Sequence, residues 1–275
     1  MKTQNYTQES GQNSEKNPDA SYHLLVRATG NMTMTKKPDN VYSIPELLTN
    51  MTLMNLSSEV EGLKKKQKET CEMAARSILY ALDCKDHYTY GHSTRVAFYS
   101  LALGRELGLN EEELYELELS ALFHDIGKIG VPDSVLLKPT RLTEEEFLQM
   151  KAHPTLSYEI LKDFEPFGKI AINAKHHHER FDGRGYPDGL KGDEIPFMSR
   201  IILIADTFDA MTSTRPYRKG LPYDVAFNEL EEFSGSQFDP ALVKHFINAM
   251  KKEESKNEKT FTLSIVNGTF EKDAA

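Results

Sequence analysis

Residues 177–187 read His-His-Glu-Arg-Phe-Asp-Gly-Arg-Gly-Tyr-Pro, and this stretch guides the interpretation of the whole chain. Neutral imidazole is the commonest protein ligand of transition metals, and an adjacent pair such as His177 and His178 rarely serves packing alone. The glycine-rich turn that follows can bring backbone close to whatever a metal holds. The stretch therefore predicts a metal site beside a tight turn.

A second cluster lies upstream, where His124 and Asp125 are followed by Lys128. Residues three and four apart share one face of a helix, so Lys128 can point where His124 and Asp125 point. This spacing fits a carboxylate that bridges two metals, with an ammonium beside them to meet a phosphate oxygen. Taken alone, the pair has another interpretation: a helix-terminal histidine near the macrodipole followed by a surface aspartate.

Three further residues are weaker candidates when each is taken singly. His92 can be a packed or exposed histidine, and His153, directly before Pro154, can be a helix-terminal histidine that closes its helix. Asp206 lies in an apolar stretch, where burial of a carboxylate requires a metal or an arginine partner. Together the candidates supply the mixture of imidazoles and carboxylates that a dinuclear centre uses. They are His92, His124, Asp125, His153, His177, His178 and Asp206.

The overall charge restricts the class of partner. The chain has 275 residues, of which 39% are hydrophobic and 27% charged, as in a soluble globular protein. A formal net charge of −9 argues against broad binding to nucleic acid or to an anionic membrane, since both rely on clustered Lys and Arg. A small anionic substrate stays open, because metal ions supply positive charge locally.

The sequence pattern carries no membrane or export signal. No apolar run approaches the roughly 20 residues that span a bilayer, and the polar N-terminus lacks the apolar core of a signal peptide. The two cysteines, Cys71 and Cys84, form neither a disulfide framework nor a CxxC pair. We therefore expect a cytoplasmic protein with free thiols.

The chain divides into four parts. Residues 1–20 are rich in Gln, Asn, Ser and Lys, and we expect them to be disordered. Ser58 and Glu61 match a capping box, and the thinly apolar, Lys-rich start of the helix that follows suits a connector or a homodimer contact. The four parts are an N-terminal extension without an assigned role (1–58), a connector or dimer helix (59–85), the main domain (86–252) and a tail (253–275).

The main domain contains repeated sequence signals for the start of a helix. Polar caps and first-turn prolines precede apolar stripes repeatedly. These signals are Asn110 before three glutamates, Thr143 with Glu146, Pro196, and Asp239 with Pro240. Apart from a short strand expected over 260–266, we find no set of alternating strands. The predicted fold is an all-α bundle from about residue 69 to 252.

Residues 86–246 resemble an HD-GYP domain, the bacterial phosphodiesterases of the HD superfamily that hydrolyse cyclic di-GMP. The resemblance implies an HD-domain helical bundle that converts cyclic di-GMP to linear pGpG, and to GMP after a second round, in bacterial second-messenger signalling. The motifs that carry it occur in order at 88–96, 124–130, 153–154, 177–190, 195–196, 200–201, 205–206 and 214–218.

The resemblance also implies a ligand set. The first metal takes His92, His124, Asp125 and Asp206, and the second takes Asp125, His153, His177 and His178. Iron or manganese is expected, and a His-rich, carboxylate-bridged site suits either metal. Some family members bind a third metal through a glutamate one helical turn before the first ligand histidine. Tyr88 stands at that position, so we expect two divalent ions.

The same resemblance assigns the substrate contacts. Asp125 and Lys128 are the expected catalytic residues, with Lys128 on the scissile phosphate, while Arg215 and Arg218 hold phosphate or guanine. Tyr186 is expected to be a turn and substrate-pocket residue and not a catalytic group, because a phenol titrates far from neutral pH. The loop is also expected to contact diguanylate cyclase (GGDEF) domains; its residues are Gly183, Gly185, Tyr186 and Pro187.

Two alternatives remain beside the hydrolase. One is a cyclic-dinucleotide receptor or interaction scaffold that has kept the fold and lost turnover. The other is a phosphodiesterase for a different cyclic dinucleotide, because the residues that recognise the base lie outside the motifs.

Overall fold

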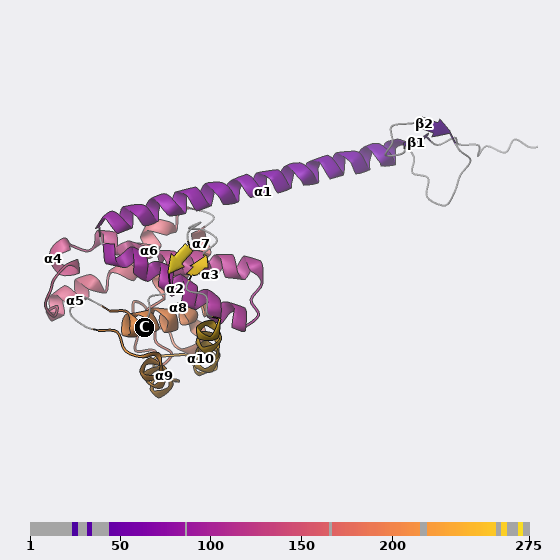
Figure 1. The fold of residues 1–275 in the computed structure, drawn as a ribbon. Coiled ribbons are helices and arrows are strands. Elements are labelled where there is room, and N and C mark those ends of the chain that lie inside the picture. The colour runs from indigo at the N-terminus through magenta and orange to yellow at the C-terminus, as the bar shows by residue number, and fades with distance from the viewer. Residues whose placement is uncertain are drawn as a thin grey trace, which may run out of the picture. The chain divides into compact units, whose positions relative to one another are not determined.

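The computed structural model describes residues 24–26, 32–34, 44–85, 87–164, 167–214, 219–256, 260–262 and 269–271. The chain forms two compact units, Met1–Gln67 and Lys68–Ala275. The described elements, shown in Figure 1, are β1 (Leu24–Val26), β2 (Met32–Met34), α1 (Ile44–Lys85), α2 (His87–Glu106), α3 (Glu111–Phe123), η1 (Ile126–Gly130), α4 (Asp133–Leu136), α5 (Glu144–Met150), α6 (His153–Leu161), α7 (Gly168–Lys175), η3 (Gly192–Glu194), α8 (Phe197–Thr212), α9 (Tyr223–Glu232), α10 (Pro240–Ser255), β3 (Thr260–Thr262) and β4 (Thr269–Glu271).

The second unit is a bundle of helices around one apolar core, which confirms the predicted all-α class. Helix α2 packs against α3, α8 and α10, while α6 packs against α7 and η1. Large side chains such as Phe123, Phe208 and Phe246 are fully buried between these helices. The described strands form two antiparallel pairs, β1 with β2 and β3 with β4. Strand β3 occupies the start of the strand expected over 260–266.

Helix α1 begins earlier than the sequence pattern predicted. It runs from Ile44, so Ser58 and Glu61 lie inside the helix and do not cap it, and the predicted start at 58–59 is wrong. The serine-glutamate pattern also occurs within helices, where both residues simply face water. The second half of α1 has one apolar face in the core of the second unit, formed by Cys71, Ala75, Leu79 and Leu82.

Three of the four predicted helix starts in the main domain are confirmed, while Pro196, expected in a first turn, lies at the N-cap position directly before α8. Asn110 and Glu113 form a reciprocal capping box at α3, and Thr143 and Glu146 do the same at α5. The Asp239 side chain accepts a hydrogen bond from the Ala241 backbone at the start of α10. Each cap satisfies backbone N–H groups that have no partner within the helix, which explains why the helices begin at these residues.

No helix in the described part of the chain combines the length and apolar character that crossing a bilayer requires. Cys71, whose side chain is described, is a buried free thiol.

Candidate metal centre

The site is built on the end of α3. The helix ends at Phe123, so His124 and Asp125 leave it together and η1 starts immediately afterwards. Ser157 on α6 ties this junction, because its Oγ donates to the His124 carbonyl and accepts from the Gly127 N–H, both at 2.9 Å. His124 and Asp125 are thereby held against α6, which begins with His153.

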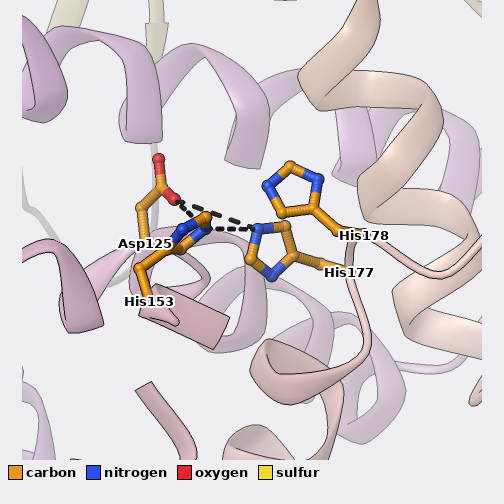
Figure 2. Close-up of side chains that lie close together, drawn as sticks. All are labelled: Asp125, His153, His177 and His178. Atoms are coloured by element: carbon orange, nitrogen blue, oxygen red, sulfur yellow. Dashed lines mark hydrogen bonds and ion pairs between the residues drawn. The ribbon is translucent and has the colours of Figure 1, made fainter. Parts of the chain in front are cut away.

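Two groups of potential ligand atoms share Asp125. One consists of Asp125, His153, His177 and His178, and Figure 2 shows Asp125 and His153 approaching the adjacent His177 and His178 from other segments of the chain. The other consists of His92, His124 and Asp125. Within each group, the ligand atoms lie within 4.8 Å of one another. The grouping places Asp125 between the two sets, as the sequence resemblance implied for a bridging carboxylate.

Asp206 on α8 lies beside the first set. Its Oδ1 is 3.3 Å from His92 Nε2, and the same nitrogen is 3.6 Å from Asp125 Oδ2. On the opposite side, His153 Nε2 lies 3.1 Å from Asp125 Oδ1 and 3.4 Å from His177 Nε2. The structure therefore brings all seven predicted ligand residues to one place.

Three of the histidines are oriented by the backbone. The Nδ1 atoms of His124, His153 and His177 lie 2.6, 2.7 and 2.6 Å from the carbonyl oxygens three residues earlier. A carbonyl oxygen only accepts a hydrogen bond, so Nδ1 carries the hydrogen and Nε2 presents its lone pair. All three rings are therefore held in the tautomer that binds a metal through Nε2.

His153 begins a helix, so the prediction that it closes one is wrong. It is the first residue of α6, and Pro154 lies in the first turn. Proline is tolerated there because the N–H that it lacks would have no partner within the helix. The start of α6 directs His153 to Asp125.

His92 is oriented by a side chain. Its Nδ1 lies 2.7 Å from Asp209 Oδ2, and Asp209 also accepts from Arg95 Nε at 2.6 Å and from Ser213 Oγ at 2.9 Å. Asp209 has no exposed surface. It follows Asp206 by three residues on α8, so both carboxylates lie on the same face of the helix and approach His92.

The loop after His178 folds back over the site. Buried Glu179 accepts backbone hydrogen bonds from Asp188 at 2.7 Å and Gly189 at 3.0 Å. A Cβ on Gly185 would lie 2.3 Å from the backbone nitrogen of Arg180, so glycine is needed where the loop crosses residues 178–180. The loop thereby carries Tyr186 to His178, with ring centroids 4.8 Å apart.

His176 directly precedes the histidine pair, and from sequence alone we expect it on the surface; this expectation is wrong, because the residue lies inside the fold. Its residue is 8% exposed, with Nδ1 3.7 Å from Glu179 Oε1 and Nε2 3.8 Å from Asp188 Oδ2. Burial lowers its pKa below the ordinary value. The folded-back loop covers His176, which local sequence could not show.

Burial and neighbouring charges set the protonation of the site. Burial, together with the neighbouring His153, lowers the pKa of His178 to about 3. Burial would raise the pKa of Asp125, but the Lys128 ammonium and His124 hold it well below its usual range. For His92, burial lowers the pKa, yet hydrogen bonds to Asp206 and Asp209 outweigh it and raise the value to about 9.

The donor set fits divalent metal ions. His124 Nε2 is fully buried and makes no hydrogen bond in the described part of the chain, although Asp125 Oδ2 lies 3.3 Å away. A buried polar atom left this way is costly unless something binds it. Imidazole nitrogens and carboxylate oxygens around a shared aspartate match borderline cations such as iron, manganese or zinc.

Lys128 lies beside the bridging carboxylate. Its Nζ is 2.5 Å from Asp125 Oδ2, and its side chain is 22% exposed. The prediction that Lys128 points where Asp125 points is therefore confirmed. Arg215 and Arg218 lie outside the described residues, as does the side chain of Tyr88 on which the two-ion expectation rests.

Sequence reasoning missed Asp209, Glu179 and Ser157. Asp209 carried the clearest signal, because it is a second acidic residue one turn after Asp206 in an apolar helix. Glu179 directly follows the histidine pair, but only the folded loop reveals its backbone partners. Ser157 carries no local signal, since its two partners come from a segment about 30 positions earlier.

The fold and the site define an all-helical domain with a histidine- and aspartate-rich metal centre. The HD domain family profile matches residues 76–242, and the chain belongs to this family. This confirms the membership expected from the motifs.

Curated bacterial proteins are similar to the chain over the same region. The chain is 42% identical over 190 residues to the cyclic di-GMP phosphodiesterase response regulator RpfG of Xanthomonas campestris, covering 68% of this chain and 49% of that protein. It is 44% identical over 169 residues to a cyclic di-GMP phosphodiesterase of Thermotoga maritima, covering 61% and 46%. It is 37% identical over 218 residues to 3'3'-cGAMP-specific phosphodiesterase 3 of Vibrio cholerae, covering 76% and 47%. The chain spans about half the length of these relatives.

Proposed function

We propose that the protein is a metal-dependent phosphodiesterase that hydrolyses cyclic di-GMP to linear pGpG, and to GMP in a second round. The observation that carries the proposal is the sharing of Asp125 between two sets of imidazole ligands. Two of the relatives above are named as cyclic di-GMP phosphodiesterases, and this supports the choice of substrate. The reaction adds water across one phosphodiester bond, so the water oxygen bonds to phosphorus and the 3′ oxygen leaves with a proton.

The metal ligands in this proposal form two sets with Asp125 in common. His92, His124 and Asp206 complete the first, and His153, His177 and His178 complete the second. When bound, two divalent ions would neutralise phosphate oxygens and activate water for attack. Iron or manganese is proposed because both accept mixed imidazole and carboxylate ligands.

The remaining residues act on the substrate. Lys128 keeps Asp125 ionised and is 22% exposed, so its ammonium can also meet a nonbridging phosphate oxygen as charge grows there. Tyr186 offers an aromatic face and a hydroxyl beside His178. Arg215 and Arg218 are proposed to hold phosphate or guanine.

Product analysis with several substrates tests the proposal. The metal-loaded full chain is incubated with cyclic di-GMP, 3'3'-cGAMP and cyclic di-AMP, and the products are resolved by chromatography. Formation of pGpG at the highest kcat/KM supports the proposal. Faster cleavage of 3'3'-cGAMP, the substrate in the name of the Vibrio cholerae relative, would replace the substrate while keeping the chemistry. Binding with two metals but no cleavage would make the protein a receptor.

Two partners belong to the same proposal. The loop of residues 183–187 is proposed to contact GGDEF domains. Helix α1 is proposed to pair with a second copy, because its exposed apolar residues Leu53, Leu56, Val60 and Leu63 are spaced by three and four positions. Sedimentation of the full chain over a range of concentrations tests the pairing, and a monomer throughout would contradict it.

A further inference from the structure

Among the described residues, Asp209 is the most deeply buried charged group to which the proposed reaction gives no role. It has no exposed surface, and three groups donate to it: His92 Nδ1, Arg95 and Ser213 Oγ. Arg95 reaches both oxygens, with Nε 2.6 Å from Oδ1 and Nη2 3.1 Å from Oδ2. A guanidinium only donates, so Asp209 is held as an ionised acceptor.

This environment determines the orientation of His92. A carboxylate that only accepts requires the hydrogen of His92 on Nδ1 when the ring is neutral, and so frees the Nε2 lone pair. That nitrogen faces Asp206 at 3.3 Å and Asp125 at 3.6 Å. His124, His153 and His177 donate to neutral carbonyls, so among these four described rings His92 is the one backed by an anion. An anionic acceptor makes an imidazole a stronger electron donor.

The two sides of the site therefore differ in charge. The side with His92 and His124 has Asp206 next to His92 Nε2, in addition to the shared Asp125. Asp209 adds a further carboxylate on the other nitrogen of His92. In the group formed by His153, His177 and His178, the one carboxylate is the shared Asp125.

We propose that Asp209 is a positioning residue for His92, and that it makes the His92 side the tighter of two unequal cation positions. The inference rests on the two-ion site proposed above, but it does not depend on which substrate is cleaved. Arg95 and Ser213 support it by fixing the Asp209 carboxylate.

The test is the titration of the metal-stripped full chain with Mn²⁺ alone, for wild type and Asp209→Asn. The amide has the same shape, but it must direct an NH₂ group at either Arg95 or His92. An NH₂ group directed at Arg95 places two hydrogen-bond donors against each other. An NH₂ group directed at His92 forces the hydrogen of that ring onto Nε2, where it blocks metal binding. We expect one Mn²⁺ step to weaken by about 10- to 100-fold while the other changes little.

Asp239→Asn is the matched control. Asp239 is also a buried carboxylate bonded to an arginine, with Oδ2 2.8 Å from Arg200 Nη1, but it caps α10 outside the ligand sets. Both Mn²⁺ steps should match wild type in this variant. Equal weakening of both steps by both variants would show a general loss of structure and overturn the proposal.

Other outcomes are equally decisive. Wild-type affinity at both steps in Asp209→Asn would overturn the inference while leaving the two-ion site intact. Fewer than two ions in wild type would instead contradict the proposed function. If Asp209→Asn does not fold by circular dichroism, Ser213→Ala carries the test, because it removes one hydrogen bond to Asp209. The same single step should then weaken about three- to tenfold, and an unchanged titration would overturn the proposal.

Discussion

The phenol ring of Tyr186 lies against the imidazole of His178, with ring centroids 4.8 Å apart and ring planes inclined by 32°. Lys151 Nζ lies 5.0 Å from the centre of the same Tyr186 ring. Burial raises the pKa of Tyr186, so its hydroxyl stays protonated and can donate a hydrogen bond at neutral pH. The glycine-rich loop therefore places an aromatic surface directly beside one predicted ligand.

Replacing Tyr186 separates the ring from the hydroxyl. Tyr186→Ala should raise KM for cyclic di-GMP by about two- to tenfold, the scale of one aromatic contact, with metal content unchanged. Tyr186→Phe keeps the ring and should stay close to wild type. Steady-state kinetics on both variants measures this, and equal defects in the two would assign the effect to the hydroxyl.

Removing the shared carboxylate should disrupt both metal positions together. Asp125→Ala is expected to abolish turnover and to release both ions, because each ligand set depends on this residue. Elemental analysis of the purified variant measures the metal content. The control is Asp193→Asn, whose side chain is 95% exposed, and it should retain both ions. Full metal content in Asp125→Ala would contradict the bridging position.

Removing the ammonium should affect rate and spare metal binding. Lys128→Ala is expected to lower kcat by about 10²–10³-fold, the scale for one lost donor that stabilises transition-state charge. Lys169→Ala removes a lysine whose side chain is 81% exposed and should keep the wild-type rate. An unchanged kcat in Lys128→Ala would remove this residue from the mechanism.

The close approach of η1 to α6 leaves no space for a side chain at Gly127. A Cβ there would lie 2.0 Å from the His153 carbonyl oxygen and 2.5 Å from the Ser157 nitrogen. Gly127→Ala should therefore push Asp125 away from His153 and destabilise the fold by about 2 kcal/mol or more. Gly168→Ala is the control, since a Cβ there meets nothing within 4 Å. Thermal unfolding compares the two, and equal stability would show that the helices move apart at little cost.

The metal-free chain should be most stable near pH 6.5. The pKa of His178 falls from 6.5 to about 3 through burial, so its contribution is present above pH 6.5 and is lost as pH falls toward 3. His92 behaves oppositely. Burial lowers its pKa, but Asp206 and Asp209 raise the value to about 9, so its contribution is complete below pH 6.5 and is lost as pH rises through 9.

Urea unfolding of the metal-free chain between pH 4 and 9.5 measures both limbs. The alkaline limb should amount to roughly 1–3 kcal/mol and should flatten in His92→Asn, which removes the titrating group. An alkaline limb that is unchanged in the variant would show that another group causes it.

The caps and the ligand residues could be predicted because each depends on local chemistry. Asn110 with Glu113, and Thr143 with Glu146, satisfy helix ends within three residues. The seven ligand candidates were identified by residue type and by their resemblance to known motifs. Their grouping around Asp125 is a property of helix packing, which places His92 and His177 on the same carboxylate from segments 85 positions apart.

The features that escaped prediction depend on partners distant in sequence. His176 is covered by a loop that returns to Glu179, and Asp209 is identified only through its contact with His92, 117 positions away. The direction of the helix at His153 was misjudged because proline disfavours a preceding helix but is accepted in a first turn. Whether a proline ends one helix or lies in the first turn of the next depends on its position relative to the helix start, which residue type alone does not reveal.

The bonds from His124, His153 and His177 to carbonyls three residues earlier have a consequence for how this protein can change. Each of these rings is oriented by a backbone carbonyl oxygen, and every amino acid supplies such an oxygen. Substitutions at the neighbouring surface can therefore reshape what the protein accepts without turning those rings away from a cation. His92 owes its direction to the Asp209 side chain, so inherited variation at Asp209 would alter the cation position beside His92.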